Sequence, residues 1–276
     1  MPSTYAHYKL GRDAAALLAP EKLAVIQQAP QLYSIGLHGP DLLFYYKPLS
    51  SNPVNRLGHD MHNRPGRTFF EAAAEVVREH PDSPGHLAYL YGFLCHFALD
   101  TVCHGYIARK EARSGISHAE IESELERVLM LADGLDPVRH KTTGHLIPSE
   151  ENAAVIADFF PGVTQAEILD ALKGMVFYLD LLVAPSAFKR QLIFTALRLA
   201  GHYPDMHGLV ITPTPNPACA DSNAELLRRF GGSARLAARL IGGYHTVLET
   251  GHAGAPVYGR TFDPKPPEQE AGERRD

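Results

Sequence analysis

Residues 87–108 read LAYLYGFLCHFALDTVCHGYIA, and this stretch decides the fold. It is long and apolar enough to suggest a membrane-spanning helix. However, His96, Asp100 and His104 lie across its middle, where ionisable groups are costly in lipid. No second stretch of this kind occurs, and the flanking residues are acidic as well as basic. The stretch therefore predicts a helix buried at the centre of an all-α protein.

Helix start signals recur through the rest of the chain. Ser83-Pro84 offers a cap and a first-turn proline to the apolar helix. Three hydroxyl residues precede a glutamate at capping-box spacing: Ser117 and Glu120, Thr164 and Glu167, and Ser222 and Glu225. The predicted helices span residues 4–17, 20–29, 67–80, 84–109, 118–133, 150–159, 164–182, 186–200 and 223–248.

The segments between these helices predict loops, and they show no strand pattern bounded by turns. The best strand candidate, residues 209–212, is short and runs into proline. Residues 48–66 are rich in Asn, Pro and Gly, and residues 201–222 are rich in proline, so both predict loops. We predict one domain over residues 1–262, a single-domain multi-helix bundle, followed by a disordered polar tail over residues 263–276.

Composition limits the class of protein. The chain has 276 residues, 45% of them apolar, and a formal net charge of −5, which argues against a stable nucleic-acid partner. Its three cysteines cannot form a disulfide framework. The first residues lack the features of a signal peptide. We therefore predict a cytoplasmic protein with no transmembrane segment, while the oligomeric state stays open.

The chemistry begins with His96-x-x-x-Asp100-x-x-x-His104 in the apolar helix. Steps of four residues place the three side chains on one stripe of a helix. An ionised aspartate among apolar residues is costly unless a cation or several hydrogen bonds compensate its charge. The stripe therefore indicates a metal site, and a buried network of His, Asp and Tyr is the alternative.

A second pair follows in the next predicted helix, as His118-x-x-x-Glu122. Both side chains share one face, and a histidine with a carboxylate is a common metal-ligand pair. The alternative is a solvated first turn, because neighbouring residues such as Glu120 and Glu124 are also acidic and suit the positive helix end.

Further candidates lie upstream: His7, Asp41, and the histidines of GHDMH, His59 and His62. The His59-Asp60 doublet raises a rival hypothesis, an HD-type metal phosphohydrolase. That class places its doublet on a helix, whereas residues 48–66 predict a loop here, so the rival is the weaker hypothesis.

Taken in order, these residues resemble the zinc-dependent phospholipase C family over roughly residues 4–125. The superfamily also includes secreted single-strand nucleases, and its members are helical bundles around three zinc ions. The ordered elements of the resemblance are His7, the Gly-x-x-Gly-Pro-Asp run over residues 36–41, His62, His96 and Asp100, His104, and His118 with Glu122.

The resemblance implies a ligand set for a polynuclear zinc site of two or three ions. It assigns to one ion Asp41, His62, His96 and Asp100, and to a second His104, His118 and Glu122. It implies a third ion between Asp100, His7 and the N-terminal end of the chain. Two features differ from the secreted enzymes: the step from Asp100 to His104 is shorter, and no tryptophan is present to serve as the N-terminal ligand.

The function implied is hydrolysis of a phosphodiester or phosphomonoester, with a small phosphoester or a phospholipid as substrate. Zinc ions would neutralise the phosphoryl oxygens and lower the pKa of a bound water toward ~7. The resemblance makes Asp41 the catalytic residue, as a ligand that orients or deprotonates that water. A non-catalytic, zinc-stabilised helical binding protein is the alternative from another class.

The remaining histidines carry weaker signals. His38 lies two residues before Pro40 and close to Asp41 in sequence, so its place relative to the site stays open. His80 and His86 flank a helix junction and are expected to be exposed. Six others lack a carboxylate at ligand spacing: His140, His145, His202, His207, His245 and His252. Cys103 is expected to be a small core residue.

Overall fold

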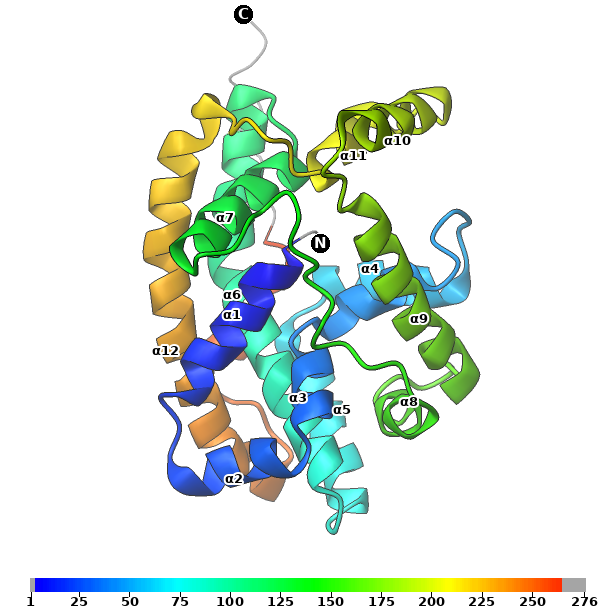
Figure 1. Cartoon of the computed structure of the whole chain (residues 1–276). Coiled ribbons are helices and arrows are strands. Elements are labelled where there is room, and N and C mark those ends of the chain that lie inside the picture. Colours follow the sequence, from blue (N-terminus) through cyan, green and yellow to red (C-terminus); the bar gives the residue numbers. More distant parts are fainter. Residues whose placement is uncertain (1–2, 265–276) are drawn as a thin grey trace, which may run out of the picture.

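The computed structural model describes residues 3–264, and helices make up nearly all of its named elements (Figure 1). In order they are α1 (Thr4–Ala15), α2 (Pro20–Gln28), α3 (Pro30–Gly36), η1 (Gly39–Tyr45), α4 (Pro53–Asn63), α5 (Gly66–Glu79), α6 (Pro84–Ser114), α7 (His118–Ala132), α8 (Glu150–Ala157), α9 (Gln165–Leu182), α10 (Ala187–Leu199), α11 (Tyr203–Met206), η2 (His207–Leu209), η3 (Pro217–Cys219), α12 (Ala220–Thr250) and η4 (Pro256–Gly259). Within residues 3–264 the only β-pairing is an isolated bridge between Pro65 and Thr261. The all-α prediction is confirmed.

The predicted apolar helix is α6, and it forms the centre of the bundle. Its residues are buried almost continuously from Gly85 to Thr101, because other helices cover it on several sides. It packs most extensively against α3 and α12. The contact with α3 is so close that a Cβ at Gly36 or at Gly92 would come 2.2 Å from a carbonyl oxygen of the other helix. Glycine at both positions lets the two backbones touch, and this fixes the chain just before Asp41.

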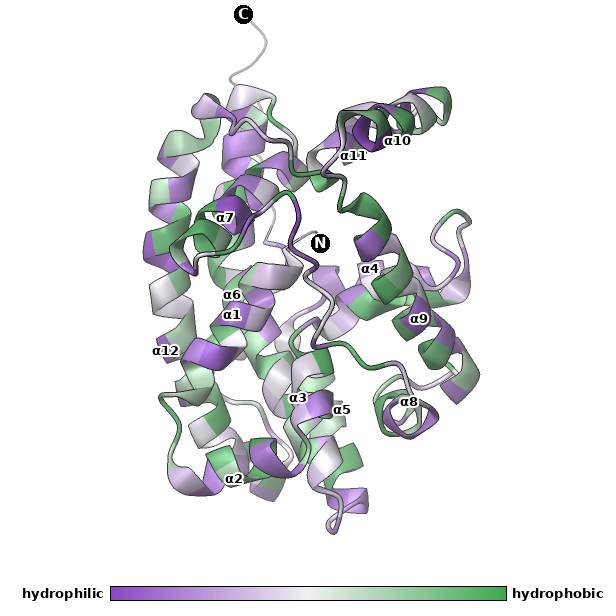
Figure 2. Ribbon diagram, viewed as in Figure 1, coloured by the Kyte–Doolittle hydropathy of each residue, from purple (hydrophilic) through white to green (hydrophobic). Residues whose placement is uncertain are grey.

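The outer helices bury one face each. On α12, residues such as Leu226, Phe230 and Tyr244 are buried, whereas polar residues cover the other side. Figure 2 shows this as alternating purple and green bands along α12. In contrast, α10 has no buried residue and projects from the bundle beside α11 (Figure 1). Among residues 3–264, no helix has the length and apolar character needed to cross a membrane.

The main correction concerns residues 48–66, which were predicted to be a loop. Residues 53–63 form helix α4 instead. Asn52 caps it through a hydrogen bond from the Asn55 amide, and the Asn55 side chain returns the bond in a capping box. Pro53 occupies the first turn, where its missing N–H costs nothing. The Asn and Pro that indicated a loop are therefore the start of a helix.

Other boundaries also differ. Helix α3 and the 3₁₀ helix η1 lie in a region with no predicted helix. The caps at Ser117 and Thr164 are present, but Ser222 lies inside α12, which starts at Ala220, so that predicted cap is wrong. Of the predicted tail, residues 263 and 264 are described, and residues 265–276 lie outside the described residues.

Candidate metal centre

Five elements bring the predicted ligands together at the middle of α6. α6 itself supplies three side chains, and α7 supplies two from its first turns. α1, η1 and α4 supply one each. The ligand atoms fall into three groups whose members lie within 4.8 Å of one another: His7, His96 and Asp100; Asp41, His62 and His96; His104, His118 and Glu122. All eight predicted ligands are members of at least one group.

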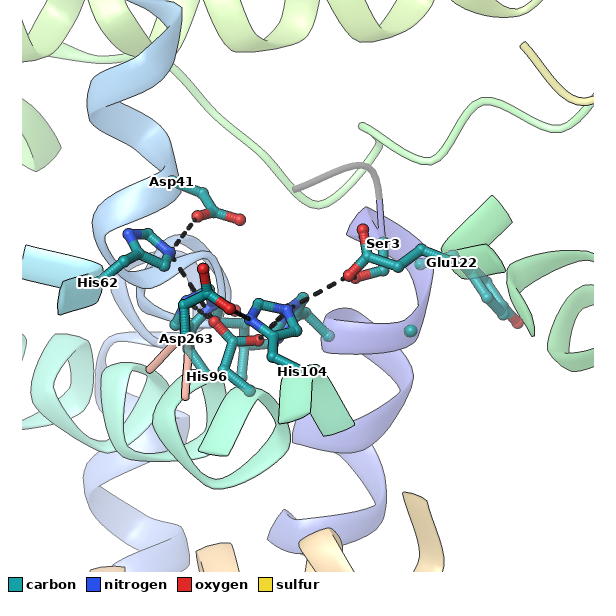
Figure 3. Close-up of polar contacts among 12 residues, drawn as sticks. Ser3, Asp41, His62, His96, His104, Glu122 and Asp263 are labelled. Carbon is teal, nitrogen blue, oxygen red and sulfur yellow. Dashed lines mark hydrogen bonds and ion pairs between the residues drawn. The ribbon is translucent and has the colours of Figure 1, made fainter. Parts of the chain in front are cut away.

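Asp100 lies between these groups. Its Oδ1 is 3.3 Å from His7 Nε2 and 3.4 Å from His104 Nε2. Its Oδ2 is 2.8 Å from His96 Nε2 and 3.9 Å from His62 Nε2. Each carboxylate oxygen therefore faces two imidazoles, which is the arrangement that a bridging ligand needs. Figure 3 shows three of these imidazoles converging, His62 from α4 and His96 and His104 from α6.

The other carboxylates lie at the two ends of the cluster. Asp41 Oδ1 is 3.0 Å from His62 Nε2. Glu122 Oε1 is 3.4 Å from both His104 Nε2 and His118 Nε2. The four-residue spacings predicted from the sequence therefore put their side chains on converging faces of α6 and α7.

Backbone carbonyls fix the orientation of two of the rings. His62 Nδ1 is 2.7 Å from the Gly58 oxygen, and His96 Nδ1 is 3.3 Å from the Leu37 oxygen. A carbonyl only accepts, so Nδ1 must carry the proton and donate it. With Nδ1 protonated, Nε2 is the ring nitrogen directed at the centre, and it is the atom through which such a ring would bind a metal after losing any proton there.

The donor set fits a cation. His7 Nε2, His96 Nε2 and Asp100 Oδ2 are buried and make no hydrogen bond with suitable geometry, although the last two atoms are only 2.8 Å apart. Buried polar atoms are normally hydrogen-bonded, and leaving several unsatisfied in one place is costly. Imidazole nitrogens and carboxylate oxygens are ligands that suit zinc. The residues present therefore fit the group that the sequence implies.

The pKa values of the buried side chains also favour a bound cation. Burial favours the neutral form of Asp100, but the positive charges available at His104 and His96 hold its pKa well below the usual range. Burial likewise opposes protonation of His62, but the hydrogen bond to Asp41 and the charge of that carboxylate raise its pKa to about 9. Without a metal, protons on the histidines have to balance the carboxylates, and a metal would replace them.

Local backbone geometry places Asp41. Gly39 has a φ of +48°, a left-handed conformation that favours glycine. A Cβ at this position would also lie 2.4 Å from the ring of His96. Gly39 therefore lets η1 start against α6, and this start turns Asp41 toward His62.

The rival HD doublet does not reach the centre. His59 and Asp60 lie on helix α4. The HD-type hypothesis was held to be weaker because residues 48–66 were predicted to be a loop, and that prediction is wrong. Both side chains are nevertheless exposed, and the His59 ring packs on Phe44 instead. Of the two histidines in GHDMH, it is His62 that meets the cluster.

A histidine pair adjoins the cluster. His38 Nε2 and His145 Nε2 are 2.7 Å apart, and the His38 ring lies 6.4 Å from that of His7. Burial lowers the pKa of His145 to about 4 and that of His38 well below its usual value, so both rings are neutral at pH 7. His145 comes from the loop after α7 and had no sequence signal, because no carboxylate lies at ligand spacing.

The chain near its C-terminal end covers the other side. Phe262 is buried, with its ring 5.8 Å from that of His62 and 6.0 Å from that of His96. The Asp263 amide donates to the His62 carbonyl, and Asp263 Oδ1 lies 3.9 Å from His104 Nδ1. Sequence reasoning missed both residues, since nothing local links them to ligands so far upstream.

Glu126 was also missed. It is buried one turn after Glu122 and accepts hydrogen bonds from the backbone amides of Tyr5 and Ala6 at 2.5 and 3.2 Å. These bonds anchor the start of α1, and with it His7. Burial raises the pKa of Glu126 to about 8, in contrast to the ionised carboxylates of the cluster.

A helical bundle that gathers eight histidine and carboxylate side chains in adjoining groups, seven of them buried and His118 partly exposed, defines a class of all-α proteins with groups that could hold metal ions. The family model described as zinc-dependent phospholipase C matches residues 6–170, which is more than half of the chain. The chain therefore belongs to the zinc-dependent phospholipase C family, and the sequence resemblance is confirmed. No curated protein and no solved structure matches the chain significantly.

Proposed function

We propose that this protein is a zinc-dependent phosphoric ester hydrolase that cleaves a phosphodiester, either a phospholipid head group or a soluble phosphoester. The observation that carries the proposal is the position of Asp100, whose two oxygens each face two imidazoles within a buried cluster. A site that only stabilises a fold needs one closed set of ligands, whereas three adjoining groups suit the several ions of a phosphoesterase.

The ligand roles follow the three groups. Asp41, His62 and His96 would hold one ion together with Asp100, whose Oδ2 faces both histidines. His104, His118 and Glu122 would hold a second. His7 and Asp100 would hold a third, so we propose two or three ions in all. When bound, zinc supplies positive charge for the phosphoryl oxygens and acidifies a coordinated water.

Side chains of the protein are proposed to position the attacking water, to transfer its proton and to exclude bulk water. Asp41 is proposed to orient the attacking water and to accept its proton, because its carboxylate is held at the edge of the cluster by His62. The neutral His38–His145 pair, beside His7, offers one donor and one acceptor through which a proton can pass. Phe262 excludes water from the side of His62 and His96.

The substrate is tested with purified, zinc-loaded protein and a panel of phospholipids, nucleotides and generic phosphodiesters. Cleavage of a phosphodiester releases a phosphomonoester, which an added phosphatase converts to inorganic phosphate. For nucleotides, whose own phosphates the phosphatase would remove, phosphate release is measured without it. Asp41→Asn should abolish release, whereas Asp60→Asn, an exposed carboxylate on α4, should not change it. Zinc-loaded protein that is inactive on every member would instead favour a zinc-stabilised binding protein.

The compartment stays a prediction from the sequence. A cytoplasmic enzyme meets lipid head groups only at membranes facing the cytoplasm. The panel should therefore include both vesicles and short-chain soluble lipids, so that a preference for either form is measured directly.

A further inference from the structure

A second cluster of metal-binding side chains lies at the junction of α5, α6 and α8. His80 follows the last residue of α5, His86 lies in the first turn of α6, and Asp158 follows the last residue of α8. Asp158 Oδ2 is 2.9 Å from His86 Nε2 and 3.7 Å from His80 Nε2. The two rings stack with centroids 4.1 Å apart. Contrary to the sequence expectation, His86 is buried and His80 is half-buried.

Hydrogen bonds hold both imidazole rings with Nε2 directed at the carboxylate of Asp158. His80 Nδ1 is 2.9 Å from the carbonyl oxygen of Val76, which only accepts, so Nδ1 must carry the proton. The Nε2 lone pair of the neutral ring then faces the carboxylate of Asp158. His86 Nε2 donates a hydrogen bond to Asp158 Oδ2 at 2.9 Å, because the carboxylate only accepts, and its Nδ1 accepts from the Ser83 hydroxyl at 2.8 Å. A metal ion at this point would replace the proton of His86 Nε2 and would also accept the Nε2 lone pair of His80, which otherwise faces the anion.

We propose that His80, His86 and Asp158 bind one divalent transition-metal ion of the zinc type. Two imidazoles and a carboxylate are borderline ligands that suit zinc, whereas calcium and magnesium prefer oxygen ligands. Water completes the coordination, because the Asp158 side chain is 44% exposed.

This site is separate from the centre on α6. His86 and His96 lie on the same helix, 96 − 86 = 10 residues apart, which corresponds to about 15 Å along the axis. It is also independent of the proposed hydrolysis, since none of its residues belongs to the central groups.

The ion would clamp α8 to the junction of α5 and α6. Asp158 enters the cluster at the end of α8, and the next residue, Phe159, packs its ring on Tyr89 with centroids 5.0 Å apart. A metal bond from Asp158 to the two histidines would hold this aromatic contact in place. The expected role is therefore structural.

The test counts zinc in full-length protein dialysed against a buffer of fixed free zinc. Asp158→Asn and His80→Ala should each lose one equivalent per chain relative to the wild type. Asp60→Asn and His59→Ala, which change an exposed carboxylate and an exposed histidine, should lose none. Asp100→Asn should lose only ions of the central site, so failure of one site is distinguished from failure of the other.

His86 is buried, so His86→Ala is not used alone. His80→Ala and Asp158→Asn are checked for an intact helical spectrum, and zinc-dependent stabilisation is then measured by thermal melting. The proposal predicts that the midpoint of the wild type rises with added zinc more than that of either variant. Equal stoichiometry and equal zinc-dependent shifts in all proteins would overturn it and leave a hydrogen-bonded His–Asp cluster.

Discussion

The two ends of the central cluster use the same residue types but differ in how they are enclosed. At one end, the His62 side chain is 10% exposed, lies against Phe262 and Phe44, and has its Nδ1 held by a carbonyl. At the other end, the His118 side chain is 30% exposed. The closed end takes its ligands from η1, α4 and α6, whereas the open end takes them from two consecutive helices, α6 and α7.

This difference in enclosure predicts which bound ion exchanges with solvent more readily. Ligands whose rings are fixed by outer partners and sealed by aromatic side chains hold a metal more tightly, because less order is lost on binding. Solvent reaches the open end through His118. We therefore expect the ion at Asp41 and His62 to be retained longest and the ion at His118 to exchange first.

Removing the metal from both ends should have the largest effect on stability. The cluster buries carboxylates and imidazoles that only a cation or protons can balance. Chelation is expected to lower the melting temperature by about 10 °C or more, which corresponds to ~4 kcal/mol of binding-linked stability in a chain of this size. Zinc should restore it. An unchanged melting curve after metal removal is verified would contradict the metal site as a whole.

Asp100 belongs to both ends, so its substitution should affect activity most. Asp100→Asn keeps the shape but removes the charge that faces four imidazoles. We expect loss of at least one ion and a fall in kcat/KM of about 100-fold or more. This is larger than the roughly 10–100-fold loss that follows removal of a residue that only hydrogen-bonds to a metal ligand. Metal analysis and kinetics check this, and full retention of both would make Asp100 a hydrogen-bonding core residue.

Single substitutions should separate the two ends. His104→Ala and Glu122→Ala are expected to deplete the same ion, because His104 Nε2 lies 3.4 Å from Glu122 Oε1. His62→Ala should deplete a different ion. His59→Ala is the matched control on the same helix and should deplete neither. In cobalt-substituted protein, each bound ion contributes its own absorption bands. If His62→Ala and Glu122→Ala lost the same bands, both residues would bind one ion and the assignment to two ions would be wrong.

The smallest effect is expected behind the open end, at Glu126. Its folded-state pKa of about 8 lies above the unfolded value, so its contribution to stability is full below about pH 4.5 and is lost as the pH rises through 8. Metal-free wild type should lose at least ~1 kcal/mol more than Glu126→Gln between pH 5 and 8.5, since one pKa unit is worth about 1.4 kcal/mol. Denaturant unfolding at several pH values measures the difference, and parallel pH profiles would show that Glu126 is ionised in the fold.

The sequence predicts the open end better than the closed end, for a physical reason. His104, His118 and Glu122 lie on two consecutive helices, so helical periodicity and a short connection nearly suffice to bring them together. The closed end needs α4, whose Asn52-Pro53 start was interpreted as a loop. It also needs the close contact of α3 and α6, which depends on glycines at 36 and 92.

Contacts across long stretches of chain were beyond sequence reasoning. His145, Phe262 and Asp263 have ordinary local surroundings, and their roles depend on which elements pack together. The resemblance to a family named the eight central side chains because their order was matched residue by residue. It offered no such pattern for the segment that covers them.

That covering segment has a consequence for how the protein is made. The last predicted ligand is Glu122, and Asp263 follows it by 263 − 122 = 141 residues. At a synthesis rate of roughly 5–20 residues per second, the ribosome completes all eight ligands about 7–28 seconds before it adds Phe262 and Asp263. During this interval the nascent chain holds its histidines and carboxylates without the aromatic cover. Ions can therefore be captured by the growing chain first, and the segment that carries Phe262 and Asp263 closes over them when it emerges later.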